Sequence, residues 1–492
     1  MSSLGTFVAR RLYRLCFLSL LLLAAAGAEP ALAQFGGGGG GFGGGGGGDA
    51  GGGGGLGGGT QGTQGLSGVA VDAEGVLQTM TVNDPRGKLT RQRIEEAMGQ
   101  LDGNLAEPSK LRKVSLTRLE QAVQQKIAAG SGPDDAMKHL AGLTRIEYVF
   151  CYPESGDIVV AGPAEPWGQS LSGRMLGIKS GRPVIELQDL VVAMRAFAPG
   201  QAEKPPIIYC SIDPTAEGLA RMQQFLKQFG RQANPNQTQF IVEQLQAQLG
   251  PQVITVGGIP ASTHFAQVLV EADYRMKLIG IGLEKPPVRL TSYVDRVSPA
   301  AVSRNALQRW YFVPDYQCVR VSDDELSMQM VGEGVKLVGE DEVVAQDGGR
   351  RTAGKANRAS QAFVNGFTKA YPRLAQRVPV YAQLRNCIDL SVAAAYMQQH
   401  DFYGQVGWNM ELFGNEELFP VETYNAPKQV ASAVNSMWKG ASLITPIGGG
   451  VSIRPSQALQ TVNLLRDEAG QIETTRDGVD LSGLDEGQWW WD

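Results

Sequence analysis

A glycine tract near the start of the sequence is the feature that most constrains how this chain can fold. Residues 36–59 contain 20 glycines in 24 positions. Such a segment buries too little apolar surface to offset the conformational entropy that is lost when it is ordered. We therefore predict that residues 34–66 are a disordered Gly-rich linker and that the folded part of the chain begins near Ser67.

The residues before this tract have the order of a secretory signal peptide. Three arginines precede an apolar run from Leu15 to Ala26, and Ala31-Leu32-Ala33 supplies the small residues of a cleavage site. The apolar run is well short of the roughly twenty residues that span a bilayer. Residues 1–33 are therefore predicted to be a signal peptide. The mature protein is expected in the periplasm, the cell envelope or the extracellular space, with no membrane span. The adjacent Arg10 and Arg11 leave the general secretory and the twin-arginine export routes open.

Charge and cysteine content exclude several classes of ligand. Removal of residues 1–33, which hold three Arg and one Glu, changes the formal net charge from −5 to −7. No basic cluster with interleaved aromatic residues follows, so nucleic-acid binding is not expected. The histidines and cysteines show no metal-ligand spacing, so neither a metal nor a cofactor is expected. The four mature cysteines lie in separate apolar segments, which favours buried free thiols and at most one disulfide; they are Cys151, Cys210, Cys318 and Cys387.

Residues 67–285 are predicted to form an α/β region. Turn signals at 72–75 and 153–156 separate short apolar runs and predict two hairpins. Apolar runs at 207–212 and 252–256 predict strands. Asp213 and Pro214 are interpreted as the N-cap and the first residue of a helix. Apolar residues at three- and four-residue spacing predict the other helices, at 89–101, 116–127, 237–249 and from Ser262 or Thr263 to about Lys277.

The remainder of the chain is divided into three further regions. Residues 286–346 are predicted to be β-rich, with strands at 288–297, 309–313, 318–321, 326–331 and 335–338. Residues 347–465 are predicted to be a helical region that starts with a polar loop at 347–357, has breaks at Pro372 and Pro379, and ends in a hairpin around Gly448–Gly450. Residues 466–492 are predicted to be an acidic disordered tail. The expected fold class is α+β or mixed α/β.

One predicted helix carries the best candidates for acid–base chemistry. His264 and Glu271 are seven residues apart and share a helix face, so they can act as a pair in a pocket. The competing interpretation is a solvated face, because Asp273, Arg275 and Lys277 follow on the same helix. The catalytic residues are therefore unknown, with His264 and Glu271 as the candidates.

A second motif has the spacing of a phosphate-binding loop. Residues 349–355 read Gly-Arg-Arg-Thr-Ala-Gly-Lys, but Ala356 replaces the hydroxyl residue that such loops place on Mg²⁺. We interpret this stretch as a solvated basic loop.

Four stretches together resemble a family of exported proteins from planctomycete bacteria that is known only as domain of unknown function 1598. The stretches are Leu140–Tyr148, Ser211–Leu219, Thr263–Ile279 and Arg309–Val344. The resemblance covers most of residues 110–455 and leaves out the glycine tract and the tail. It implies export and one shared architecture, and it implies no activity, ligand or catalytic residue.

Two functions are compatible with these features. The first is a non-enzymatic binding or structural component of the cell envelope that contacts an unknown protein or envelope partner. The alternative is a secreted hydrolase that uses carboxylates and His264 in an interdomain cleft. A pocket lined by His264 and Glu271 favours the hydrolase, whereas a flat apolar patch favours the binding protein.

Overall fold

The computed structural model describes residues 66–492, with gaps at residues 85, 102, 201–205, 230–234, 298–305, 345–349, 353–356, 436–437, 440–441 and 444–446. The described residues belong to one unit within Gln34–Asp492. The predicted signal peptide and nearly all of the predicted linker lie outside the described residues.

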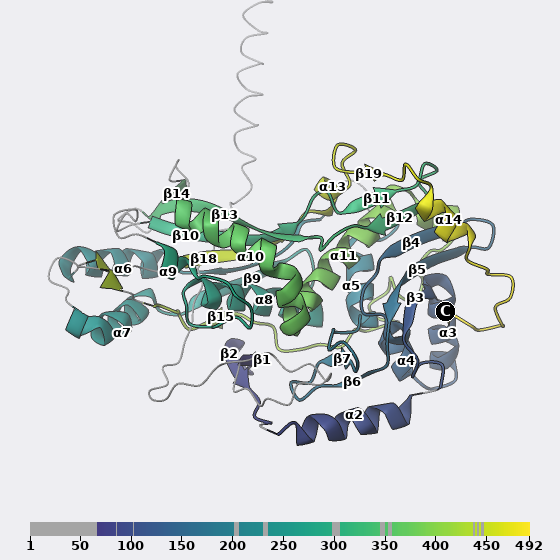
Figure 1. Cartoon of the computed structure of the whole chain (residues 1–492), viewed down its shortest axis with the longest axis horizontal. Coiled ribbons are helices and arrows are strands. Elements are labelled where there is room, and N and C mark those ends of the chain that lie inside the picture. The colour runs from purple at the N-terminus through teal and green to yellow at the C-terminus, as the bar shows by residue number, and fades with distance from the viewer. Residues whose placement is uncertain are drawn as a thin grey trace, which may run out of the picture. The chain divides into compact units, whose positions relative to one another are not determined.

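Most of the described strands form two mixed sheets, as the predicted fold class requires (Figure 1). The larger sheet has the order β1 (Leu66–Val71), β2 (Val76–Thr81), β15 (Gln429–Val430), β9 (Gln252–Gly257), β8 (Ile208–Asp213), β18 (Ile447–Ile453), β10 (Ala306–Pro314), β13 (Val335–Val344) and β14 (Arg350–Thr352). Only the β2–β15 and β10–β18 pairs in it are parallel. This sheet contains strands from all three of the regions predicted between residues 67 and 465.

The smaller sheet has the order β19 (Leu465–Arg466), β11 (Val319–Val321), β12 (Ser327–Met330), β4 (Tyr148–Tyr152), β5 (Asp157–Ala164), β3 (Ser109–Ser115) and β20 (Trp490–Trp491). All of its pairs are antiparallel except β11–β19. Two short hairpins lie outside both sheets: β6 (Trp167–Gln169) with β7 (Met175–Gly177), and β16 (Trp438–Lys439) with β17 (Ser442–Leu443).

Helices cover the sheets. Helix α8 packs on β8 and β18, α10 packs on β13, and α11 packs on α5, α8 and α10 (Figure 1). None of the described helices is both long and apolar enough to cross a membrane. The helices are α2 (Lys88–Gln100), α3 (Leu116–Ala128), α4 (Asp135–Lys138), α5 (Leu187–Ala196), α6 (Ala216–Phe229), α7 (Thr238–Leu249), α8 (His264–Gly280), α9 (Tyr293–Arg296), α10 (Arg358–Arg377), α11 (Pro379–Gln399), α12 (Phe402–Gln405), α13 (Pro455–Ala458) and α14 (Gln471–Asp477), with 3-10 turns η1 (Leu140–Gly142) and η2 (Pro235–Gln237).

Local sequence signals placed many elements correctly. Both predicted hairpins form, β1–β2 and β4–β5, and a glycine with positive φ closes each turn, Gly75 at 86° and Gly156 at 73°. Glycine adopts this conformation without the Cβ clash that other residues meet. Helix α8 begins after Thr263, whose side chain accepts a hydrogen bond from the Ala266 N–H at 3.2 Å, as predicted.

The predicted cap of the helix after β8 is wrong. Asp213 is the last residue of β8, and α6 begins three residues later. The Thr215 hydroxyl accepts the hydrogen bond from the Gly218 N–H at 3.0 Å, so Thr215 occupies the capping position. Strand pairing with β9 extends as far as Asp213, which moves the helix start beyond Pro214.

Four other predictions are corrected where tertiary packing outweighs local preference. Gly448–Gly450 lie inside β18, between β8 and β10, and do not form a turn. Pro372 lies inside α10, because the buried face that includes Phe367 and Tyr371 continues past it. Residues 288–297 are not a strand, since Ser292 caps the short helix α9 with its hydroxyl. The predicted loop at 347–357 contains β14, and Gly349 and residues 353–356 lie outside the described residues.

The predicted disordered tail is also wrong. Residues 466–492 contain α14 and β20, and the indoles of Trp489 and Trp491 are 7% and 9% exposed. Trp491 packs in a cluster with Phe150 and Val159 of the smaller sheet. Burial of large indoles offsets the low apolar content of the rest of the segment.

Candidate functional site

Helix α8 carries both candidate residues and is buried along almost its whole length. All of residues 265–280 except Gln267 are buried, because the larger sheet covers one side of the helix and α5 and α11 cover the other. The competing prediction of a solvated face is therefore wrong. Four charged residues lie inside the protein, with exposed fractions of 4% or less: Glu271, Asp273, Arg275 and Lys277.

His264 lies between two carboxylates at the start of this helix. Its Nδ1 atom is 2.8 Å from Oδ2 of Asp189, and its Nε2 atom is 3.7 Å from Oε1 of Glu186. Glu186 is the N-cap residue of α5 and Asp189 lies in the first turn of that helix. Only 16% of the His264 side chain is exposed, so these contacts take place with little solvent around them.

The two carboxylates determine the charge of the imidazole. Burial lowers the pKa of His264, but the Asp189 and Glu186 carboxylates outweigh burial and raise it to about 9. Burial also raises the pKa of Asp189, and the imidazole beside it opposes that effect. Glu186 adds a second negative charge next to the ring, so the two carboxylates together favour the imidazolium form of His264.

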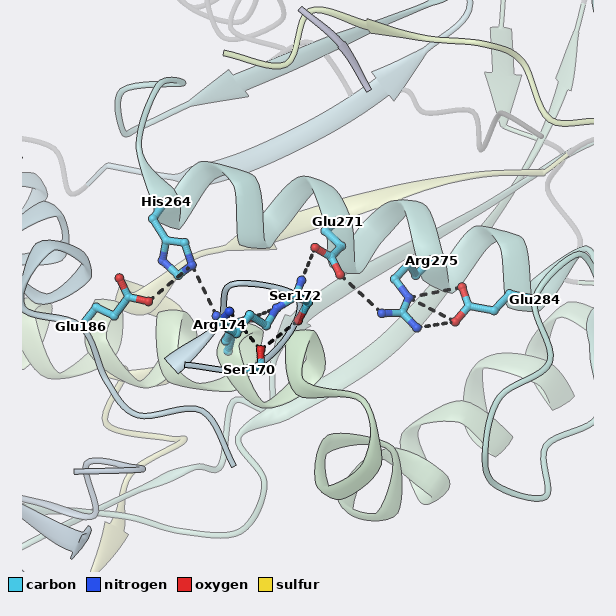
Figure 2. A network of polar contacts seen from close by, with 9 residues as sticks. Ser170, Ser172, Arg174, Glu186, His264, Glu271, Arg275 and Glu284 are labelled. Atoms are coloured by element: carbon cyan, nitrogen blue, oxygen red, sulfur yellow. Dashed lines mark hydrogen bonds and ion pairs between the residues drawn. The ribbon is translucent and has the colours of Figure 1, made fainter. Parts of the chain in front are cut away.

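Glu271 belongs to a chain of ion pairs along the same helix face (Figure 2). Arg174, from the turn between β6 and β7, pairs with Oε2 of Glu271, and Nη1 of Arg275 is 3.4 Å from Oε1 of the same carboxylate. Nη2 of Arg275 is 2.7 Å from Oε1 of Glu284, which follows the helix. Each oxygen of Glu271 therefore faces a guanidinium group. Burial raises the pKa of Glu284, which Arg275 opposes.

Gln383 of α11 connects the two groups of charges. Its Oε1 atom accepts a hydrogen bond from Nε of Arg174 at 2.9 Å, and its Nε2 atom is 3.3 Å from Nε2 of His264. The structure thus brings His264 and Glu271 into one network, through Gln383 and Arg174. We name this set the α8 network: Arg174, Glu186, Asp189, His264, Glu271, Arg275, Glu284 and Gln383.

A separate ion pair lies elsewhere on α8. Nζ of Lys277 is 2.7 Å from Oδ2 of Asp273, and neither side chain is exposed. Burial lowers the pKa of Lys277, and it raises the pKa of Asp273 to about 6, with the attraction between the two groups acting against both shifts. Cys210 and Asp213 of β8 interact electrostatically with this pair.

Two hollows in the described part of the chain are lined by neither His264 nor Glu271. The first, of 170 Å³, is lined by Val192 and Arg195 of α5 and by the loop Gly258–Pro260 among others. The second, of 280 Å³, lies at Arg118 and Gln121 of α3, and Glu486 and Gly487 also line it.

The possible ligand groups and the cysteines of the described residues bear on the metal and disulfide predictions. No three His, Cys, Asp or Glu side chains in that part of the chain are placed to hold a metal ion. The four mature cysteines are buried free thiols, and burial raises the pKa of each. The free-thiol alternative is the one that the structure shows.

Sequence reasoning did not identify the partners of the two candidate residues. Arg174, Glu186 and Asp189 lie 75 to 97 residues before the α8 residues that they contact, so no spacing pattern connects them. A signal was present in α5, where an acidic residue directly precedes an apolar run, Asp189-Leu-Val-Val-Ala. A buried carboxylate requires a cationic or hydrogen-bonding partner from elsewhere in the fold.

The fold and this network define a mixed α/β protein with an ion-paired helix in its interior. Residues 210–293 match the model of a family described as "Protein of unknown function (DUF1598)". The matched residues run from β8 to the first residue of α9 and contain all of α8. No curated protein and no solved structure matches the chain. The predicted resemblance is confirmed over this stretch, while its larger extent and the export and planctomycete origin that it implies stay predictions.

Proposed function

We propose that this protein is an exported, non-enzymatic binding or structural component of the cell envelope, spaced from its surroundings by the glycine tract. Export rests on the signal-like order of residues 1–33, and the spacer role rests on the composition of residues 36–59. The proposed lack of catalytic activity rests on the pairing of the charged residues in the α8 network.

The observation that carries this proposal is the position of His264 between the carboxylates of Asp189 and Glu186. A general base works best when its pKa lies near the working pH, so that a large fraction is unprotonated. With a pKa of about 9, only about one His264 side chain in a hundred is neutral at pH 7. Glu271 is likewise engaged by two guanidinium groups. These residues neutralise one another, as expected of groups that hold α5, α8 and the β6–β7 turn in position.

The test uses the whole chain in its own cells, together with a matched variant. The double substitution His264→Gln and Asp189→Asn removes one positive and one negative charge and leaves the side-chain sizes nearly unchanged. We expect both proteins in the envelope fraction, with the same neighbours identified by cross-linking and mass spectrometry. We also expect neither protein to hydrolyse envelope polysaccharide or protein prepared from those cells.

Two results contradict the proposal. Recovery of the chain in the cytoplasmic fraction shows that the protein is not exported. Hydrolysis of envelope material by the original chain that falls at least 100-fold in the double variant shows that the α8 network is an active site, which is the hydrolase alternative.

A further inference from the structure

The last residues of the sequence occupy a site at the edge of the smaller sheet. Strand β20 pairs with β3 in an antiparallel manner, with Trp490 opposite Val114 and Trp491 opposite Lys113. The Ser115 N–H donates a hydrogen bond to the Trp489 carbonyl at 2.9 Å. The other edge of β3 is paired with β5, so β3 is held in its sheet independently of the tail.

A buried arginine binds the side chain of Asp492 in this segment. Arg112 of β3 is 0% exposed, and its Nε and Nη2 atoms donate to Oδ1 and Oδ2 of Asp492 at 2.8 and 2.9 Å. The Trp490 ring lies over the same guanidinium group, with its centroid 4.7 Å from Cζ. A bidentate guanidinium–carboxylate pair is both strong and geometrically selective, and an aromatic ring over the cation adds to it.

The arginine is positioned by groups that do not belong to the tail. Nη1 donates to the Ala141 carbonyl at 2.8 Å, and Nη2 donates to the carbonyls of Glu107 and Asn104 at 3.1 and 3.3 Å. These carbonyls lie in the turn before β3 and in the η1 turn. The guanidinium therefore keeps its orientation when Asp492 leaves, and the site is preformed.

The residues that connect Leu484 to β20 allow β20 to separate from β3. Leu484 still packs against the Phe150 cluster, but residues 485–487 are exposed, and Gly487 has φ 83° with open space around its Cα. The half-exposed Asp492 side chain, a strand of only two residues and the packing of the buried Trp489 and Trp491 side chains complete the attachment. The segment after Leu484 can thus detach at the cost of the Trp491 packing in the cluster that also contains Ile472 of α14.

We propose that the β3 edge with Arg112 is a binding site for an extended Trp-Trp-Trp-Asp peptide segment, which the chain's own residues 489–492 occupy until a segment of the same chemistry from another protein displaces them. Strand addition supplies the backbone hydrogen bonds, and Arg112 with the indole contacts selects the sequence. The inference rests on the proposed binding function in taking another protein as the source of the segment. The tail is present at high effective concentration, so the displacing segment must compete with it.

A labelled peptide tests this site directly. The probe is fluorescein-labelled Gly-Gln-Trp-Trp-Trp-Asp, residues 487–492, with an amidated end so that the Asp side chain supplies its only carboxylate. Two acceptors are used: the chain that stops after Gly487, and the full chain with Asp492→Asn, which keeps every tail residue. We expect the peptide to bind both acceptors by fluorescence anisotropy, and to bind the unaltered full chain at least tenfold more weakly than the truncated one.

Matched peptides and one receptor variant give the controls. Asn in place of the peptide Asp is expected to weaken binding at least tenfold, and so is Arg112→Lys in the acceptor, since Lys cannot make the bidentate pair. The peptide control does not depend on the folding of any protein variant. Equal affinity of the Asp and Asn peptides for the acceptors, or no binding to either acceptor, overturns the inference. The proposed envelope function is tested by localisation and cross-linking, so it can stand when this site fails.

Discussion

Replacement of Arg275 by alanine is expected to lower the free energy of unfolding by about 3–5 kcal/mol. Arg275 is 4% exposed and lies between the carboxylates of Glu271 and Glu284. Its removal leaves Glu284 without its partner in a buried place and leaves Glu271 with Arg174 alone. A buried charge without compensation is costly, and this cost exceeds the modest net value of the intact pairs.

Urea unfolding of the variant and of two controls measures this effect. Arg91→Ala, on the exposed face of α2, is expected to change the free energy of unfolding by no more than about 0.5 kcal/mol. Adding Glu284→Gln to Arg275→Met is expected to recover much of the loss, because Glu284 is then uncharged and Glu271 keeps its ion pair with Arg174. A loss below about 1 kcal/mol for Arg275→Ala means that the network is solvated and that its ion pairs do not hold the fold.

Stability is expected to fall as the pH rises from about 6.5 to about 9, because His264 loses its proton over this range. The folded pKa of His264, about 9, is higher than the ordinary value of 6.5. The ion pairs of the imidazolium therefore stabilise the fold fully below pH 6.5. This contribution declines above that pH and is lost beyond pH 9, a change on the order of 3 kcal/mol.

The matched double variant isolates the contribution of this one group. Urea unfolding between pH 6 and pH 9 is expected to show a steep decline for the original chain and a flatter profile for His264→Gln with Asp189→Asn. Other groups that titrate in this range, such as Asp273, are present in both proteins. Identical slopes for the two proteins contradict an imidazolium at position 264.

Much of the fold could be predicted from sequence where the signal was local. The β4–β5 hairpin follows from a turn containing Gly156 between two apolar runs, and the start of α8 follows from Thr263. Elements whose environment is set by distant residues were missed. Gly448–Gly450 look like a turn until β8 and β10 are placed on either side, and Trp489–Trp491 look like part of a tail until β3 is known to accept them.

The candidate site was predicted only in part, for a related reason. The sequence placed His264 and Glu271 on one helix face, and the structure joins both in the α8 network. The sequence does not indicate that the helix is covered on both sides, so the charges after Glu271 were expected on a solvated surface. The residues that set the charge of His264 come from α5, and their role depends on a tertiary contact that no spacing in the sequence encodes.

The titration of His264 by NMR tests the central claim most directly. Histidine labelled with ¹³C and ¹⁵N gives separate signals for His139, His264 and His400, and a His264→Gln sample assigns the one from the α8 network. We predict that His264 is protonated at pH 7 and titrates near pH 9, as an ion-paired structural group does. A neutral His264 at pH 7 that titrates near pH 6 would instead give the protein an available general base, and that result contradicts a non-enzymatic α8 network.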